Sequence, residues 1–362
     1  MADNPWHYAV VVGIDQYPRI DAGSYDLKCP IRDAETVSGW LTSAQGGNLA
    51  PERVATLTRT IPAGRSPPVP VYDEINSAIL GCVDDFLTRR NKELSNETER
   101  KKAWKMSRFY FYISGHGMAG DGDDAVLITA NATRKTLNNI STRNVLLKLK
   151  NEKVFGELVV LADCCRELAA AEVQTLPWDL AEYRGYNDPI LPRSFVAYAS
   201  RNRKRAFEPP PGSAVMTSIF TRALIEGLEG GVPGNEVESK SLENFLYNYV
   251  PKLAEQLGTP PQNPEIRSDP GIIFVQTSKS YRVTLRAAAG SPFAALGSIN
   301  AVETQGKLVR SRYTLNSSAP GVFTGTLPTG FYLAVASGAD PFAGAPHFAF
   351  SVLGQDQDAD IS

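Results

Sequence analysis

The stretch GELVVLADCCRE, residues 156–167, runs from a short apolar segment directly into Asp163, Cys164, Cys165 and Arg166. A continuous apolar run of this length is typical of a strand that is buried on both faces of a parallel sheet. In open α/β folds, ligands and catalytic groups gather just beyond the carboxyl ends of such strands. The stretch therefore predicts a buried strand that ends in a candidate functional cysteine.

A second stretch of the same kind is RFYFYISGHGMAG, residues 108–120, which carries His116 between two glycines. A cysteine nucleophile needs a base to form its thiolate, and of the three histidines only His116 follows a predicted buried strand. Either signal alone is weak, because a cysteine after a strand is most often a small buried hydrophobe. Together, at two strand ends, they predict a Cys–His pair.

The first 278 residues alternate apolar runs with helical patterns. Strands are expected at 8–14, 54–57, 108–113, 125–128, 158–162, 195–198 and 272–275, and helices at 31–41, 71–90, 141–149, 218–228 and 242–257. This alternation predicts an α/β domain with a mostly parallel sheet and helices on both faces.

The pattern changes after residue 278. Alternating stretches such as YRVTLRA and GFYLAVASG, separated by Gly, Pro, Ser and Asn, are typical of a small all-β, sandwich-like domain. We therefore expect a catalytic domain over 1–278, a β domain over 279–354 and an acidic tail over 355–362 that frays.

Composition limits the function classes. The net charge is −2, with 37 Lys and Arg against 39 Asp and Glu, which gives no electrostatic footprint for nucleic acid. No apolar run reaches the length of a membrane span, and the N-terminus does not resemble a signal peptide. The four cysteines, at 29, 82, 164 and 165, fit neither a disulfide framework nor a zinc site, so a reducing, cytoplasmic setting is expected.

These motifs resemble those of the caspase/metacaspase superfamily of cysteine peptidases. YISGHG resembles the motif of the catalytic histidine, and LADCCRE resembles the Asp-x-Cys motif of metacaspases. Cys165 follows His116 by 49 residues (165 − 116), close to the spacing of about 50 in caspases. The segments VVVGIDQY, LKCPIRDAETV, FVAYASRNRKRAFE and SIFTRALIEGL extend the resemblance over residues 5–277, but not into the β domain.

The resemblance implies a role for each matching residue. Cys165, two residues after Asp163, would be the nucleophile, with Cys164 as the alternative, and His116 would take and return its proton. The backbone N–H groups of Gly117 and Cys165 would form the oxyanion hole. Asp163, Asp33 and Ser114 would line the pocket for the residue before the scissile bond, which predicts cleavage after Arg or Lys. For Asp33, the competing interpretation is a solvated acid in the first turn of a helix.

Further expectations follow from the same resemblance. The substrate would be a protein or peptide with a basic residue before the cleaved bond, and self-cleavage could fall after Arg184, Arg193, Arg203 or Arg205. No cofactor is expected. Calcium activation has no clear motif, because the spacing of Asp121, Asp123 and Asp124 is not that of an EF-hand loop. We expect these three acids to be solvated side chains in a turn.

The β domain is expected to bind a partner or to regulate the protease. By analogy of fold alone, the compact arrangement suggests a prokaryotic member with a role in immune or cell-death responses. The alternative is a catalytically silent scaffold whose β domain binds a partner. A nucleotide-binding protein is disfavoured, because no strand is followed by GxGxxG or GxxxxGK[ST].

Overall fold

The computed structural model describes residues 4–21, 26–58, 69–120, 122–168, 190–210, 213, 217–232, 236–276, 280–305, 308–328, 330–344, 346–352 and 356–361. The chain divides into two compact units, residues 1–225 with 243–272 and residues 226–242 with 273–362. The domain boundary at 278–279 that the sequence suggests stays a prediction.

The first unit is built on a six-stranded sheet with the order β11-β9-β7-β3-β1-β2. Its strands are β1 (His7–Gly13), β2 (Val54–Thr58), β3 (Arg108–Gly115), β7 (Glu157–Cys164), β9 (Arg193–Tyr198) and β11 (Glu265–Ser268). All neighbours are parallel except β11, which runs antiparallel to β9. The predicted α/β class with a mainly parallel sheet is confirmed.

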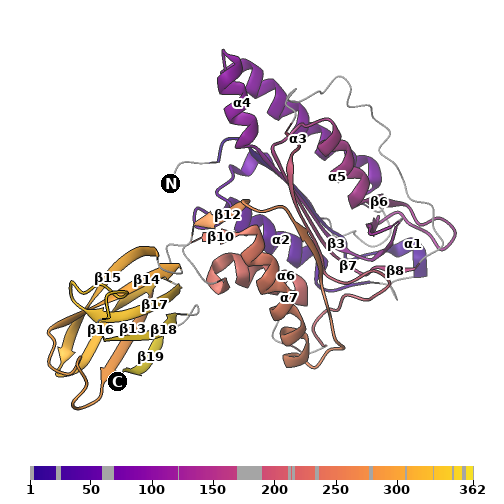
Figure 1. Ribbon diagram of the computed structural model, residues 1–362. Coiled ribbons are helices and arrows are strands. Elements are labelled where there is room, and N and C mark those ends of the chain that lie inside the picture. Colours follow the sequence, from indigo (N-terminus) through magenta and orange to yellow (C-terminus); the bar gives the residue numbers. More distant parts are fainter. Residues whose placement is uncertain are drawn as a thin grey trace. The chain divides into compact units, whose positions relative to one another are not determined.

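Helices cover both faces of this sheet, as Figure 1 shows: α3 and α5 lie on one face, and α2, α6 and α7 lie on the other. The helices are α1 (Pro18–Asp21), α2 (Pro30–Thr42), the 3-10 turn η1 (Pro51–Arg53), α3 (Tyr72–Glu93), α4 (Glu97–Lys105), α5 (Thr142–Asn151), α6 (Ile219–Glu226) and α7 (Ser239–Gln256). The five predicted helices correspond to α2, α3, α5, α6 and α7. The predicted cap of α5 is present, because Ser141 Oγ accepts a hydrogen bond of 3.0 Å from the N–H of Asn144.

The two central strands carry the motifs. β3 and β7 are eight residues long and buried throughout, which explains why both read as unbroken apolar runs. Their parallel register pairs Ser114 with Asp163 and Gly115 with Cys164. The two strand ends that the sequence marked are therefore direct neighbours.

A small sheet with the order β6-β5-β4-β8 extends from these ends. It consists of β4 (Gly117–Ala119), β5 (Ala125–Ile128), β6 (Asn139–Ser141) and β8 (Glu167–Leu168). The pairing of β4 with β8 links the chain after His116 to the chain after Cys165.

The strand predicted at residues 272–275 does not join the central sheet. Residues 272–275 were expected to complete the parallel sheet, but β12 (Ile273–Gln276) pairs antiparallel with β10 (Glu236–Glu238) in a separate sheet. The sixth strand of the central sheet is β11, whose sequence EIRS has one buried residue. A polar antiparallel edge strand lacks the apolar run that reveals a buried parallel strand.

The second unit contains the π-helical turn η3 (Gly227–Gly231), β10, β12 and a seven-stranded sheet with the order β18-β17-β14-β15-β16-β13-β19. The strands of this sheet are β13 (Ser280–Ala287), β14 (Ser298–Gln305), β15 (Leu308–Ala319), β16 (Val322–Pro328), β17 (Gly330–Ala336), β18 (His347–Val352) and β19 (Gln357–Ile361). The all-β prediction is confirmed, and the strands form one sheet whose outer strands β18 and β19 contact each other, close to a barrel.

The expectation that the acidic tail frays is wrong for residues 357–361. They form β19, which pairs in parallel with β13, and Ile361 is buried in the core of the sheet. The buried side chain at Ile361 and the backbone pairing with β13 fix the strand, although its acidic residues remain exposed.

None of the helices in the described ranges combines the length and the apolar character needed to cross a membrane.

Candidate active site

The candidate site lies where β3 and β7 end. His116 follows β3 and Cys165 follows β7, and both residues line the same two pockets. Parallel neighbours present their carboxyl ends at one edge of the sheet, and their register leaves no offset between the two ends. The structure therefore brings together the histidine and the cysteine that the sequence singled out.

Gly117 lies against the cysteine pair. A Cβ atom added at this position would lie 2.5 Å from Cys164 Sγ and 2.6 Å from the carbonyl oxygen of Cys165. Both distances are shorter than van der Waals contact, so only glycine fits between His116 and the cysteines. The predicted oxyanion donors, the N–H groups of Gly117 and Cys165, are thus on adjoining segments.

The adjacent cysteines occupy different environments. Cys164 is 2% exposed, whereas Cys165 is partly exposed. Burial raises the pKa of the Cys164 thiol well above its ordinary value. Cys164 therefore packs against Gly117 as a small core residue at the wall of one pocket, whereas Cys165 lines both pockets.

The thiol of Cys165 interacts with the backbone of Ala206. The N–H of Ala206 donates to Sγ at 3.4 Å, and Sγ lies 3.5 Å from the carbonyl oxygen of the same residue. Burial raises the pKa of the Cys165 thiol, and the N–H of Ala206 opposes this shift only in part. The resting group is thus a thiol that needs a base before it can attack.

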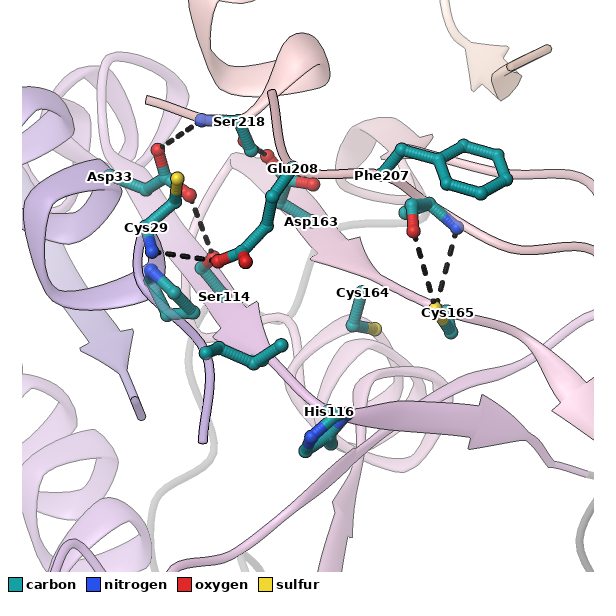
Figure 2. Close-up of a pocket in the computed structure, with 14 residues that line it drawn as sticks. Cys29, Asp33, Ser114, His116, Asp163, Cys164, Cys165, Phe207, Glu208 and Ser218 are labelled. Atoms are coloured by element: carbon teal, nitrogen blue, oxygen red, sulfur yellow. Dashed lines mark hydrogen bonds between the residues drawn. The ribbon is translucent and has the colours of Figure 1, made fainter. Parts of the chain in front are cut away.

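One of the two pockets is acidic. It has a volume of about 90 Å³ and brings together Asp33, Asp163 and Ser114, as Figure 2 shows. Asp33, on the first turn of α2, is completely buried, so its interpretation as a solvated helix acid is wrong. None of the described residues that line this pocket is a lysine or an arginine.

Ser218 connects the two aspartates. Its N–H donates to Asp33 Oδ1 at 2.8 Å, and its hydroxyl donates to Asp163 Oδ2. Ser114 Oγ donates to Asp33 Oδ2 at 3.1 Å, and Thr221 donates to Asp163 Oδ2 through its N–H (3.0 Å) and hydroxyl (2.6 Å). These donors fix the orientation of both carboxyl groups before any ligand enters.

The pKa values of both carboxyl groups are raised. Burial is the main cause for Asp33, and the nearby Asp163 adds to it. For Asp163, burial outweighs the hydrogen bonds from Ser218 and Thr221, and Glu208 raises the pKa further. Two carboxylates in one small buried space repel each other. This repulsion is reduced when one carboxylate binds a proton or when a cation binds between them.

The sequence analysis missed Glu208, a third acid of this pocket. Its Oε1 accepts hydrogen bonds of 2.7 Å from the N–H groups of Lys28 and Cys29, at the N-terminus of α2. Figure 2 shows it on the same side of the pocket as Asp33 and Asp163. Glu208 lies in the segment FVAYASRNRKRAFE, which was noted only for its resemblance, and no local pattern marks its side chain as directed inward.

Arg166 directly follows Cys165 and lies in the interior of the first unit. Its side chain is fully buried, donates 2.6 Å to Glu265 Oε2 and 3.1 Å to the carbonyl oxygen of Asp124, and lies 4.6 Å from the ring centre of Tyr198. These contacts join the segment after β7 to β9 and β11. Arg166 therefore holds the turn that contains Cys165 in place through these buried contacts.

Of the residues expected to allow self-cleavage, Arg184 lies outside the described residues. Arg193 begins β9 within the central sheet and pairs with Glu157. Arg203 and Arg205 are exposed, and Arg205 pairs with Glu167 at 2.8 Å.

The acids considered for calcium have other partners. Asp121 lies outside the described residues, and Asp123 pairs with Arg267 at 3.0 Å. Asp124 is buried, not solvated, and accepts hydrogen bonds from Ser141, Thr142 and Arg143 at the start of α5. In the described part of the chain, no three His, Cys, Asp or Glu side chains are placed to hold a metal ion.

Comparison with known families identifies the class. Residues 7–271 match the model of the caspase domain family of peptidases, and the chain belongs to this family. It is 27% identical over 241 residues to a Desulfuromonadales bacterium protein named a probable protease. That match covers 62% of this chain but only 26% of the relative, so the chain spans about a quarter of the relative's length.

Solved structures of similar chains include caspase-1 from Spodoptera frugiperda and a protein from Geobacter sulfurreducens. The caspase-1 structure is 15% identical, with 77% of this chain and 93% of that chain covered and a TM-score of 0.47. The Geobacter protein is 14% identical, with 76% and 98% covered and a TM-score of 0.42. The family assignment thus rests on the match of residues 7–271 to the caspase domain.

Proposed function

We propose that the protein is an endopeptidase in which Cys165 and His116 form the catalytic dyad and cleavage follows Arg or Lys. The observation that carries the proposal is the acidic pocket beside Cys165, where Asp33, Asp163 and Glu208 gather without a described lysine or arginine. Carboxylates that are partly removed from water bind a cationic side chain strongly when its donors match their oxygens.

Catalysis would proceed in two steps. His116 takes the thiol proton, Sγ attacks the carbonyl carbon, and the backbone N–H groups of Gly117 and Cys165 hold the oxyanion. The C–N bond breaks as His116 returns the proton to the leaving amine. A water molecule then hydrolyses the thioester, and His116 accepts and returns its proton.

The pocket would select the residue before the scissile bond by charge. The donors that bind Asp163 in the described structure all bind Oδ2, so Oδ1 is left for a ligand. A cation in the pocket would also offset the repulsion that, in addition to burial, raises the pKa values of Asp33 and Asp163. Ser114 would add a hydroxyl at the pocket wall.

The test is the hydrolysis of fluorogenic peptides that differ only before the scissile bond: Arg, Lys, citrulline, Asp or Ala. Citrulline has the shape of arginine without its charge. We expect turnover of Arg and Lys peptides, loss of activity in Cys165→Ala, and retained activity in Cys164→Ala. A preference for Asp would overturn the pocket assignment, and activity that survives Cys165→Ala would overturn the nucleophile.

The second candidate, a catalytically silent scaffold, predicts no hydrolysis of any of these peptides by the folded protein. Self-cleavage and regulation by a partner of the β domain stay predictions. Mass spectrometry of the protein after incubation, beside Cys165→Ala, would reveal new termini after Arg184, Arg203 or Arg205 if self-cleavage occurs.

A further inference from the structure

A second, larger pocket adjoins the candidate dyad. It has a volume of about 800 Å³ and shares His116 and Cys165 with the acidic pocket, but contains none of its three acids. In the view of Figure 2, the three acids lie above Cys165 and His116 lies below it. The dyad thus lines two pockets of different chemistry.

The floor of the second pocket is apolar. Met118 on β4, Ile128 on β5, Ile20 on α1 and Leu137 line it, and the first three are buried. Leu137 is partly buried and packs against the main core of the unit. These side chains come from four separate segments, so the hollow is a product of the fold and not of a single loop.

The rim of the pocket carries charge. Arg134 is exposed, and its Nε donates 2.9 Å to the carbonyl oxygen of Ile20, which fixes the guanidinium at the edge. Arg205 and Glu167 form an exposed ion pair at 2.8 Å. Among the described residues of this rim, two arginines face one glutamate, which makes it more cationic than the acidic pocket.

The order of bond breaking sets the direction of the bound chain. When Sγ bonds to the carbonyl carbon, the residue before the scissile bond remains on the enzyme with its side chain in the acidic pocket. The amine that leaves takes its proton from His116, so the chain that follows the bond starts beside His116. The pocket that contains His116 without the acids is therefore on the leaving-group side.

We propose that this pocket binds the side chain that follows the scissile bond and selects a large apolar residue there. The inference rests on the proposed function, because it takes its direction from the roles of Cys165 and His116. Binding of an apolar side chain to the apolar floor is favourable because it removes apolar surface from water. The arginines at the rim repel a cationic side chain. The preferred site is thus a basic residue followed by an apolar residue, and a pair of basic residues is disfavoured.

The test uses internally quenched peptides with Arg before the bond and Leu, Gly or Lys after it. We expect kcat/KM to be about tenfold higher for Leu than for Gly, the size of discrimination that an apolar pocket gives. The Lys peptide should be cleaved more slowly than the Gly peptide. A peptidyl-Arg methyl ester, whose leaving methanol is too small to fill the second pocket, reports the acidic pocket and the dyad alone.

Two variants assign the preference to the pocket. Leu137→Asn should reduce the ratio of Leu to Gly, and Arg134→Glu should raise cleavage of the Lys peptide. Both should leave the hydrolysis of the peptidyl-Arg methyl ester within about twofold of the wild type. Leu147→Asn, at an exposed leucine on α5 that lines neither of the two pockets, is the matched control and should change no ratio.

The outcomes separate this inference from the proposed function. If the wild type cleaves the peptidyl-Arg methyl ester but treats Leu, Gly and Lys alike, the inference is wrong and the proposed function stands. If the wild type cleaves no Arg substrate, the inference is tested by binding instead. Fluorescence anisotropy measures the affinity of Cys165→Ala for the Leu, Gly and Lys peptides. Equal affinities for the three would then overturn the inference independently of turnover.

Discussion

The phenolic oxygen of Tyr17 accepts a hydrogen bond of 2.8 Å from the backbone N–H of His116, and the two rings lie 4.8 Å apart. Tyr17 is fully buried, and burial raises the pKa of its hydroxyl, which therefore stays protonated. This contact holds both the backbone and the ring of His116 at the end of β3. Tyr17 is thus a positioning residue for the proposed base.

Removing the hydroxyl and removing the ring of Tyr17 should have different effects. Tyr17→Phe leaves the N–H of His116 without its acceptor, and we expect kcat to fall about tenfold with little change in KM. Tyr17→Leu also removes the ring that packs against the imidazole, so we expect a further loss of kcat.

The control for these variants is Tyr72→Phe, which removes a hydroxyl on α3, outside the site. If kcat were unchanged in both Tyr17→Phe and Tyr17→Leu, the proposed positioning role of Tyr17 would be refuted.

Replacing Gly117 by alanine should separate His116 from the cysteines. The added Cβ would meet Cys164 Sγ and the carbonyl oxygen of Cys165, and neither can move without shifting the turn after β7. We expect kcat/KM to fall about 100-fold and the protein to lose about 1–3 kcal/mol of stability. Peptide hydrolysis and urea unfolding measure the two effects.

Gly81→Ala is the matched control, because Gly81 is exposed on α3 and nothing lies within 4 Å of an added Cβ. This change should stabilise the protein by about 0.5–1 kcal/mol and leave hydrolysis unchanged. If Gly117→Ala were as active as the wild type, the close approach of Gly117 to Cys164 and Cys165 would be contradicted.

The charge of Asp163 can be removed with its hydrogen bonds retained. Because the donors from Ser218 and Thr221 all bind one oxygen, the single carbonyl oxygen of asparagine can accept them. We expect Asp163→Asn to lower kcat/KM for the Arg peptide at least about 100-fold, because a buried cation loses its partner. Cleavage of the citrulline peptide should change little, and equal losses for both peptides would show that the role is structural.

The same variant should alter how stability depends on pH. The raised pKa of Asp163 means that the folded state favours the protonated form. This group therefore stabilises the fold at low pH, and the contribution is lost as the pH rises from the ordinary value of 3.8 through the raised pKa. As the pH rises from 3.8, the Tm of Asp163→Asn should fall less than that of the wild type. Parallel curves of Tm against pH would contradict the raised pKa of Asp163.

Alkylation should report the protonation of Cys165. Because burial raises the pKa of this thiol, the rate of reaction with iodoacetamide should still increase above pH 9.0, its ordinary value. Cys29, Cys82 and Cys164 are 5%, 8% and 2% exposed and should react far more slowly. Mass spectrometry locates the label, and Cys165→Ser should remove the fast phase. A rate that levels off below pH 7 would instead indicate a resting thiolate.

The sequence predicted the frame of the first unit because its signals are local. The buried strands β3 and β7 appear as apolar runs, and each is followed at once by a chemically distinctive residue, His116 or Cys165. The helices α2, α3 and α5 appear through their periodicity and, for α5, through the cap at Ser141. Parallel strands end at one edge, so the meeting of the two motifs followed from the fold class.

The features that the sequence did not reveal depend on pairing between distant segments. The polar edge strand β11 has no apolar run, and β19 is fixed by its neighbour β13 despite its acidic composition. Glu208 enters the acidic pocket only because its carboxylate meets the start of α2, 179 residues earlier in the chain.

The sequence by itself thus determined the α/β fold, the caspase-like motifs and the candidate pair His116 and Cys165, because periodicity and motif spacing are properties of short segments. Only the tertiary structure decided that Asp33 is buried beside Asp163, that Ser218 binds both, and that Tyr17 supports His116. These relationships join segments up to 185 residues apart, and their strength comes from burial and from distances of about 3 Å, which no local pattern encodes.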